Sequence, residues 1–76
     1  MTTQRLSELP VGSRGRLVFV NVDHNLRKRL LALGVVLGQE LLVLHHRSKG
    51  IVVQSKGSRI ALGGDIVDKL QLEINE

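Results

Sequence analysis

The chain has 76 residues, no cysteine and a formal net charge of +4. This length favours one domain over residues 1–76 with a small hydrophobic core, and the lack of cysteine excludes disulfide bonds and thiolate metal sites. The positive charge permits an anionic partner, but a single aromatic residue, Phe19, argues against nucleic acid, whose single strands proteins bind by stacking bases on aromatic rings.

The first part of the chain predicts extended segments separated by turns. Residues 6–9 form a short extended piece or a single turn that closes at Pro10. Residues 14–22 predict a strand, with Leu17 and Phe19 on one face and three valines on the other. Because both faces are apolar, this strand is either covered on both sides or presents an apolar face to a partner.

Residues 26–34 are the one convincing helix. Leu26, Leu30 and Leu33 lie within about 40° of one another on a helical wheel, and they predict the stripe that packs on the core. Gly34 can adopt the left-handed conformation that ends a helix. The candidates for capping its first turn are Asp23 and Asn25.

The second half of the chain predicts an antiparallel meander. A two-residue connection at Gly57-Ser58 joins two of its strands into a hairpin. Asp65 can cap one helical turn from Ile66 to Lys69. The predicted strands are residues 40–47, 51–56, 59–62 and 70–74.

These elements favour a mainly β fold, a small SH3-like barrel of about five strands. One short helix is inserted after the first long strand, and a helical turn precedes the last strand. Closing the sheet would remove exposed strand edges, and the inserted helix would cover one opening of the barrel.

The order of these motifs resembles ferrous iron transport protein A, FeoA, over nearly the whole chain. The resemblance implies a small cytosolic SH3-like domain that accompanies FeoB, a membrane ferrous iron transporter with a cytosolic GTP-binding domain. Similar domains form the C-terminal module of some metal-dependent repressors. The motifs are Leu9-Pro10-x-Gly12, Gly15-Arg16-Leu17-Val18, the segment from Leu26 to Gly34, Gly38, and Arg59-Ile60-Ala61-Leu62.

The chain departs from the family pattern at two turns. Ser48-Lys49-Gly50 is shorter than the loop that the family commonly has between its middle strands. Val36-Leu37 stand where the family often has a polar residue and a proline. The turn after the helix is therefore unusually apolar.

Catalytic and cofactor-binding motifs are missing from the sequence. No serine lies in a nucleophile-elbow motif, and the glycines form neither a phosphate-binding loop nor a dinucleotide fingerprint. No nucleophile can be paired with a base from spacing alone. We therefore expect a protein that is not an enzyme and has no cofactor.

Three histidines, His24, His45 and His46, are the candidate metal ligands. Adjacent residues on a strand point to opposite faces, so His45 and His46 cannot both bind one ion from one strand. A metal site also needs three or four convergent ligands. Ordinary surface histidines are the favoured interpretation, and a transition metal bound by His24 with one of the others is the alternative.

Arg27, Lys28 and Arg29 form a basic cluster that covers a wide arc of the predicted helix. Such a cluster is either a solvated face or a means of steering the protein toward an acidic partner or the inner leaflet. Charge elsewhere in the chain is dispersed, which argues against a dedicated nucleic-acid groove.

Leu31 lies about 100° away from Leu30 on the wheel, off the predicted stripe. It either packs under a neighbouring strand or joins Val35, Val36 and Leu37 in an exposed apolar patch rimmed by basic residues. A patch of that kind is typical of an interaction surface, and we favour it as the partner-binding site together with the basic cluster.

The resemblance and the patch together predict a non-catalytic accessory protein of ferrous iron uptake that binds the cytosolic part of an FeoB-like transporter. It would be cytoplasmic, without a membrane span of its own, and peripheral at the inner membrane through its partner. The alternatives are a nucleic-acid-binding small β-barrel and a metal-responsive regulatory module. Strands that are apolar on both faces also leave weak self-association open.

Overall fold

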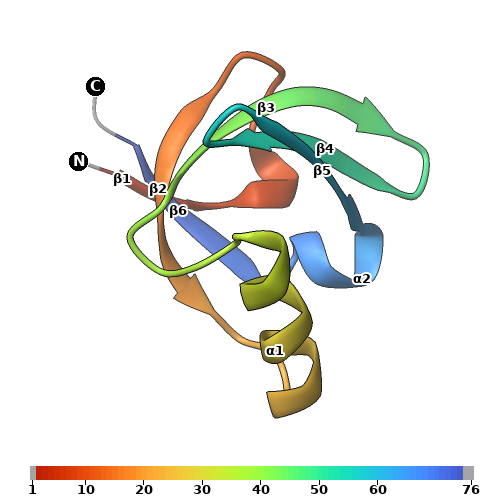
Figure 1. The fold of residues 1–76 in the computed structure, drawn as a ribbon. Helices are drawn as coiled ribbons and strands as arrows, with labels where there is room; N and C mark the ends of the chain where they lie inside the picture. The colour runs from red at the N-terminus through yellow and green to blue at the C-terminus, as the bar shows by residue number, and fades with distance from the viewer. Residues whose placement is uncertain (1, 75–76) are drawn as a thin grey trace.

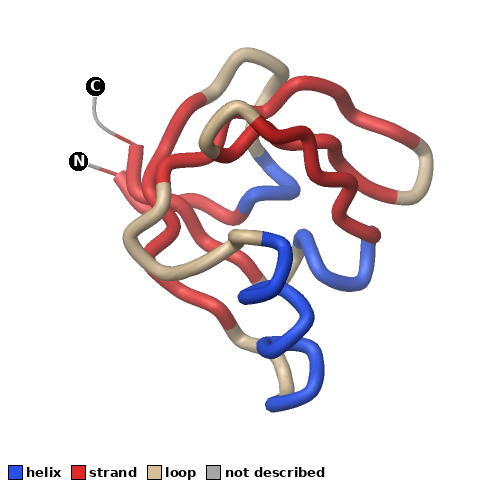
Figure 2. Tube along the Cα trace, viewed as in Figure 1, coloured by secondary structure: helices blue, strands red, loops and turns tan. Residues whose placement is uncertain are grey.

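One antiparallel sheet contains the six strands of the computed structural model, which describes residues 2–74. Its strand order is β1-β6-β2-β3-β4-β5, and the strands curl around the core, with α1 and α2 together on one side (Figure 1, Figure 2). The strands are β1 (Thr2–Arg5), β2 (Arg14–Val20), β3 (Glu40–Arg47), β4 (Gly50–Ser55), β5 (Ser58–Gly63) and β6 (Leu70–Ile74). The helical elements are the 3₁₀ turn η1 (Leu6–Glu8), α1 (His24–Leu33) and α2 (Gly64–Val67).

The predicted mainly β architecture is confirmed, with two differences. A sixth strand, β1, pairs with β6 from Thr2 opposite Ile74 to Arg5 opposite Gln71. Within residues 2–74 the sheet is open, with β1 and β5 as its end strands, where the sequence predicted closure. Two exposed edges therefore remain.

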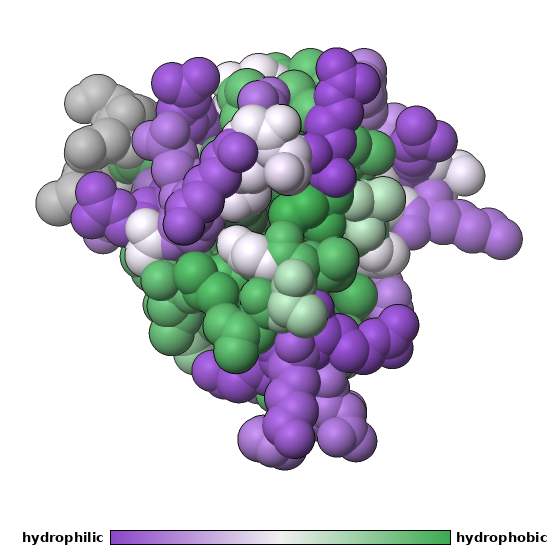
Figure 3. Space-filling view, viewed as in Figure 1, coloured by the Kyte–Doolittle hydropathy of each residue, from purple (hydrophilic) through white to green (hydrophobic). Residues whose placement is uncertain are grey.

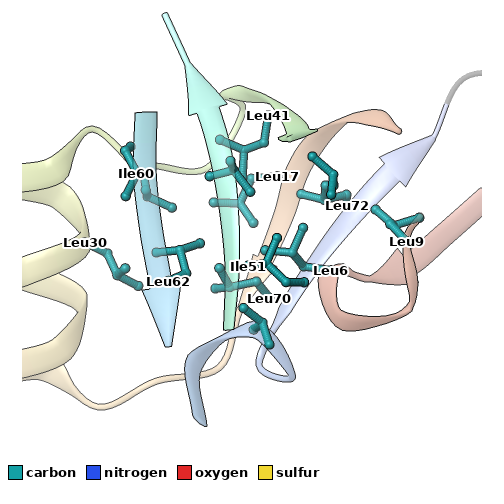
Figure 4. Close-up of a cluster of buried hydrophobic side chains, with 14 residues drawn as sticks. Leu6, Leu9, Leu17, Leu30, Leu41, Ile51, Ile60, Leu62, Leu70 and Leu72 are labelled. Carbon is teal, nitrogen blue, oxygen red and sulfur yellow. The ribbon is translucent and has the colours of Figure 1, made fainter. Parts of the chain in front are cut away.

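The core consists of leucine, valine and isoleucine side chains (Figure 4). They come from the five strands β2, β3, β4, β5 and β6, and also from η1 and α1. β6 lies between β1 and β2, and its Leu70 and Leu72 have no exposed surface. Burial of apolar side chains is the main force that holds so small a sheet in its bent shape. The largest buried side chains are Leu6, Leu17, Leu30, Leu41, Leu70, Leu72, Val43 and Val53.

A β-bulge in β2 separates two residues that the sequence placed on one face. Leu17 lies opposite Leu72, but Phe19 lies opposite Gln71, so one residue of β2 is left unpaired between them. The bulge shifts the alternation by one position. Leu17 is therefore buried, whereas Phe19 is 47% exposed.

Helix α1 ends at Gly34 as predicted, but it begins at His24, two residues before the predicted segment, with Asp23 as its N-cap. Oδ1 of Asp23 accepts a hydrogen bond of 2.8 Å from the backbone N–H of Leu26, and Gly34 has the left-handed φ of 89°. The predicted core stripe is wrong at one position. Leu30 is buried and Leu26 is half-buried, but Leu33 is 54% exposed, because a helix at the open side of the sheet meets the core along a narrow line.

The β4–β5 hairpin turns at Lys56-Gly57, one residue earlier than predicted. Both residues have positive φ, 51° and 82°, and Ser55 pairs with Ser58 across the turn. A two-residue turn with positive φ at both positions matches the right-handed twist of the two strands that it joins.

Helix α2 starts two residues earlier than the sequence predicted. Gly63 is its N-cap and makes no side-chain capping bond, so Asp65 lies inside the first turn and does not cap the helix.

Candidate functional site

The C-terminal end of α1, the following loop and the end of β2 enclose an apolar groove of about 320 Å³. We call it the Leu31 groove. Its floor contains the buried side chains of Leu30 and Val35, and its rim contains Leu31 and Leu37, which are 62% and 55% exposed. The groove is lined by Val20, Arg27, Leu30, Leu31, Val35, Val36 and Leu37.

The loop after α1 is shaped by the way the helix ends. The N–H of Gly34 donates to the carbonyl oxygen of Leu31 at 3.0 Å, and the N–H of Val35 donates to that of Leu30 at 2.9 Å. This pair of bonds is the Schellman motif, in which the residue after the glycine packs back on the last turn. Val35 therefore turns inward and Leu37 is left at the surface.

Further backbone bonds hold this loop against β2. The N–H of Gly38 donates to the carbonyl oxygen of Leu17 at 2.7 Å, and the N–H of Leu17 donates to that of Gln39 at 2.9 Å. One wall of the groove is thus tied to the sheet, and the groove exists before any partner binds. A preformed groove lowers the ordering cost of binding.

Arg27 is the charged residue that lines the Leu31 groove. Its Nη2 donates a hydrogen bond of 3.1 Å to the carbonyl oxygen of Val20, at the end of β2. The three basic residues do not act as one patch. Arg29 lines a different hollow, on the other side of α1, and Lys28 is exposed.

The structure therefore brings together most of the predicted partner-binding residues. Arg27, Leu31, Val36 and Leu37 meet at one groove. Val35 was expected to be exposed, and this is wrong: it is 3% exposed, because the Schellman motif turns it into the core. Figure 3 shows hydrophobic side chains gathered at the lower left, over the loop that follows α1, with hydrophilic side chains above and below them.

The histidines lie on different elements. His24 is the first residue of α1, and His45 and His46 are consecutive in β3. Nε2 of His46 lies 2.6 Å from the carbonyl oxygen of Leu9, so His46 links β3 to the end of η1. Within the part of the chain that the structure describes, no three His, Asp or Glu side chains are grouped to hold a metal ion.

Sequence reasoning missed a second hollow on the opposite side of α1. It measures about 360 Å³ and lies between α1 and the end of β5, with Leu26 and Leu33 among its walls. The sequence assigned both leucines to the core stripe. The exposure of Leu33 depends on how α1 leans on the sheet, for which no sequence signal exists.

A family model described as the FeoA domain matches residues 4–74. The chain belongs to the FeoA family. Membership supports a role in ferrous iron transport. A search of curated proteins found no match.

Solved structures agree with this assignment. The FeoA protein from Chlorobium tepidum is 29% identical, with a TM-score of 0.86 over 93% of this chain and 70% of that one. A protein described as an iron uptake regulatory protein, FeoA, is 28% identical, with a TM-score of 0.85 over 93% of this chain and 96% of that one.

Two more distant structures share the fold. The Stenotrophomonas maltophilia FeoA complexed with zinc, described as a prokaryotic SH3 domain protein, is 24% identical, with a TM-score of 0.72 over 96% of this chain and 91% of that one. A manganese-dependent transcriptional repressor is 18% identical, with a TM-score of 0.89 over 99% of this chain and 38% of that one. At these identities the likeness shows the SH3-like fold alone.

Among residues 2–74, no helix has the length and the apolar character that crossing a membrane requires.

Proposed function

We propose that this FeoA-family protein is a non-catalytic accessory protein of ferrous iron uptake, which binds the cytosolic part of an FeoB-like transporter through the Leu31 groove. Family membership supports the link to iron transport. The observation that carries the docking site is a preformed apolar groove with two exposed leucines on its rim and an anchored arginine beside them.

The groove suits an apolar side chain of the partner. The groove is large enough to hold several water molecules, and these would be released when an apolar group enters. Buried apolar anchors of this kind usually carry most of the binding energy at an interface. Leu31 and Leu37 would close over the anchor from both sides.

The basic residues would act at the edge of this interface. Arg27 is already oriented by its bond to Val20, so a partner carboxylate can pair with it without ordering a long side chain. Lys28 is exposed and free to raise the rate of encounter with an acidic surface. Added salt would therefore slow association more than it weakens the apolar contact.

Docking needs no chemistry in this chain. A protein that binds one conformation of the transporter's cytosolic part more tightly than another shifts the population toward the first. In this proposal the protein is cytoplasmic and reaches the inner membrane only through its partner.

The test is a titration against the isolated cytosolic GTP-binding part of the transporter from the same organism, in near-physiological salt. We expect saturable binding that the double substitution Val36→Ser, Leu37→Ser weakens by about tenfold or more. The matched control is Val11→Ser, because Val11 is 59% exposed and lies outside the groove.

The fold of each variant would be checked by its thermal unfolding before the titration. Wild-type affinity in the double variant, or equal losses in the double variant and in Val11→Ser, would contradict the proposed docking site. A failure of the wild-type protein to bind would contradict this choice of partner.

A further inference from the structure

Strand β5 ends the sheet and leaves one of its hydrogen-bonding edges unused. Within residues 2–74, β5 pairs with β4 alone. Edge strands are ready templates for a further strand, and proteins commonly guard them with charged residues or proline. β5 has Arg59 as its only charged residue, and its C-terminal half is Ala61-Leu62-Gly63.

The register of the hairpin identifies the backbone groups at this edge. Ser55 and Ser58 flank a two-residue turn and form a hydrogen-bonded pair, so hydrogen-bonded and non-hydrogen-bonded pairs alternate from there. The N–H of Gly64 donates to the carbonyl oxygen of Lys49 at 2.8 Å, which continues the same alternation. It follows that Arg59, Ala61 and Gly63 direct their N–H and C=O groups away from β4.

Two hollows flank this part of the edge, and Ala61, Leu62 and Gly63 line both of them. The outer hollow, about 520 Å³, lies on the face that carries Val52 and Ala61. Arg47 and Lys49 also line it, and it has no acidic residue in its lining. It is therefore a basic recess.

The inner hollow is the 360 Å³ space between β5 and α1. Most of the residues that line it are apolar, but an arginine, an aspartate and the backbone of β5 also contribute polar surface. The residues that line it from α1 and α2 include Leu26, Arg29, Leu33, Asp65 and Ile66. Figure 4 shows Leu30 reaching from α1 toward Ile60 and Leu62 of β5, which holds the helix beside the strand.

We propose that an extended segment of a partner protein adds to the β5 edge as a seventh strand, and that this segment alternates acidic and apolar residues. Successive side chains of a strand point to opposite faces. In a strand placed beside Ala61 and Gly63, one set would enter the basic outer hollow, and the other would enter the inner hollow, where Leu26 and Leu33 of α1 offer apolar contacts. Backbone bonds would supply affinity and the two hollows would supply selectivity.

The charges argue against a second copy of this chain as the occupant. A neighbouring β5 would bring another Arg59 toward the recess that contains Arg47 and Lys49, and like charges at such a contact are unfavourable. Proline-rich ligands are also a poor match. They need grooves lined with aromatic rings, and the chain's single aromatic residue, Phe19, lies on β2.

The probe is a capped hexapeptide of alternating glutamate and valine, titrated into the full chain and followed through its backbone amide NMR signals. Two control peptides test the pattern: alternating lysine and valine, and three glutamates followed by three valines. We expect the alternating acidic peptide alone to shift the amide signals of Arg59, Ala61 and Gly63 and to slow their exchange with solvent.

Two variants test the two parts of the proposal. The double charge reversal Arg47→Glu, Lys49→Glu should weaken binding of the acidic peptide by about tenfold and strengthen binding of the lysine peptide. Ala61→Pro removes one outward N–H without removing a bond to β4, and it should abolish binding. Unchanged thermal unfolding of the double reversal would show that its effect is not a loss of fold.

Equal binding of the block peptide, or acidic-peptide binding that leaves the Ala61 amide unprotected, would overturn strand addition. Absence of binding by the alternating acidic peptide would overturn it as well. A concentration-dependent rise in mass of the protein alone, abolished by Ala61→Pro, would assign the edge to self-association instead. None of these measurements involves the transporter or the Leu31 groove, so this inference and the proposed function can fail separately.

Discussion

The backbone N–H of Val35 donates a 2.9 Å hydrogen bond to the carbonyl oxygen of Leu30, and both side chains belong to the buried core cluster. This one relationship decides which residues after α1 are structural and which are at the surface. Val35 closes the core at the end of the helix, and the next two residues are displaced toward solvent. The groove thus owes its shape to the helix end.

Val35 and Leu37 should therefore respond oppositely to truncation. Val35→Ala removes buried methyl groups and should lower the free energy of unfolding by about 2 kcal/mol. Leu37→Ala removes exposed surface and should change it by less than about 0.5 kcal/mol. Urea unfolding of the two variants beside the wild type measures both values. Similar losses in the two variants would show that Leu37 also belongs to the core.

Asp23, which precedes α1, and Asp65, which lies in the first turn of α2, should also differ. Asp23→Ala removes the capping bond to the N–H of Leu26 and should cost about 1 kcal/mol of stability. Asp65 makes no such bond, so Asp65→Ala should stay within about 0.5 kcal/mol of the wild type. Thermal unfolding of both variants checks the pair. A larger loss at Asp65 would contradict the observed start of α2.

Gly15 lies where β2 passes close to β6. A Cβ at this position would lie 2.7 Å from Cδ1 of Ile74 and 2.9 Å from the carbonyl oxygen of Glu73. Gly15→Ala should therefore destabilise the fold by about 2 kcal/mol, because the backbone of β6 has little freedom to move away.

Gly64→Ala is the matched control for Gly15→Ala. The nearest atom to its added Cβ, the carbonyl oxygen of Lys49, would be 3.5 Å away, an ordinary contact. Because Gly64 is also helical, alanine should leave stability unchanged or raise it by less than about 1 kcal/mol. Denaturant midpoints that shift equally for the two alanine variants would refute the close approach.

His46 and His45 differ in their contacts, although they are neighbours in β3. Replacing His46 by alanine removes the hydrogen bond to the carbonyl oxygen of Leu9 and should cost about 1 kcal/mol. His45→Ala should have an effect below about 0.5 kcal/mol. Calorimetric unfolding without added metal gives both numbers. If only added metal revealed a difference between the variants, His46 would be a ligand rather than a link to η1.

Local signals explain what the sequence could predict of the fold. The bounds of β3 match the predicted residues 40–47, and the ends of α1 follow from Asp23 and Gly34. These features depend on residues within a few positions of one another. By contrast β1 is a polar segment, and it is a strand because β6 lies beside it. Nothing within residues 2–5 indicates that neighbour.

The candidate site was predictable to a similar extent. The sequence identified Leu31, Val36 and Leu37 as unusual because they fall off the helical stripe or follow a helix-ending glycine. It could not show that Val35 turns inward, since the burial of Val35 depends on the core residues that pack around it. The sequence also could not identify β5 as an edge strand, because that depends on the order of the strands in the sheet.

The place of β6 has a consequence for how the protein is made. β6 comes last among the described strands, yet it lies between β1 and β2 and pairs with both. While the ribosome is still adding residues 70–74, the sides of β1 and β2 that will meet β6 have no partner. The sheet cannot be completed before residues 70–74 have left the ribosome. Folding therefore depends on contacts between distant parts of the chain, which makes it slow. The emerging chain therefore exposes strand edges that chaperones can shield and that other nascent chains can capture.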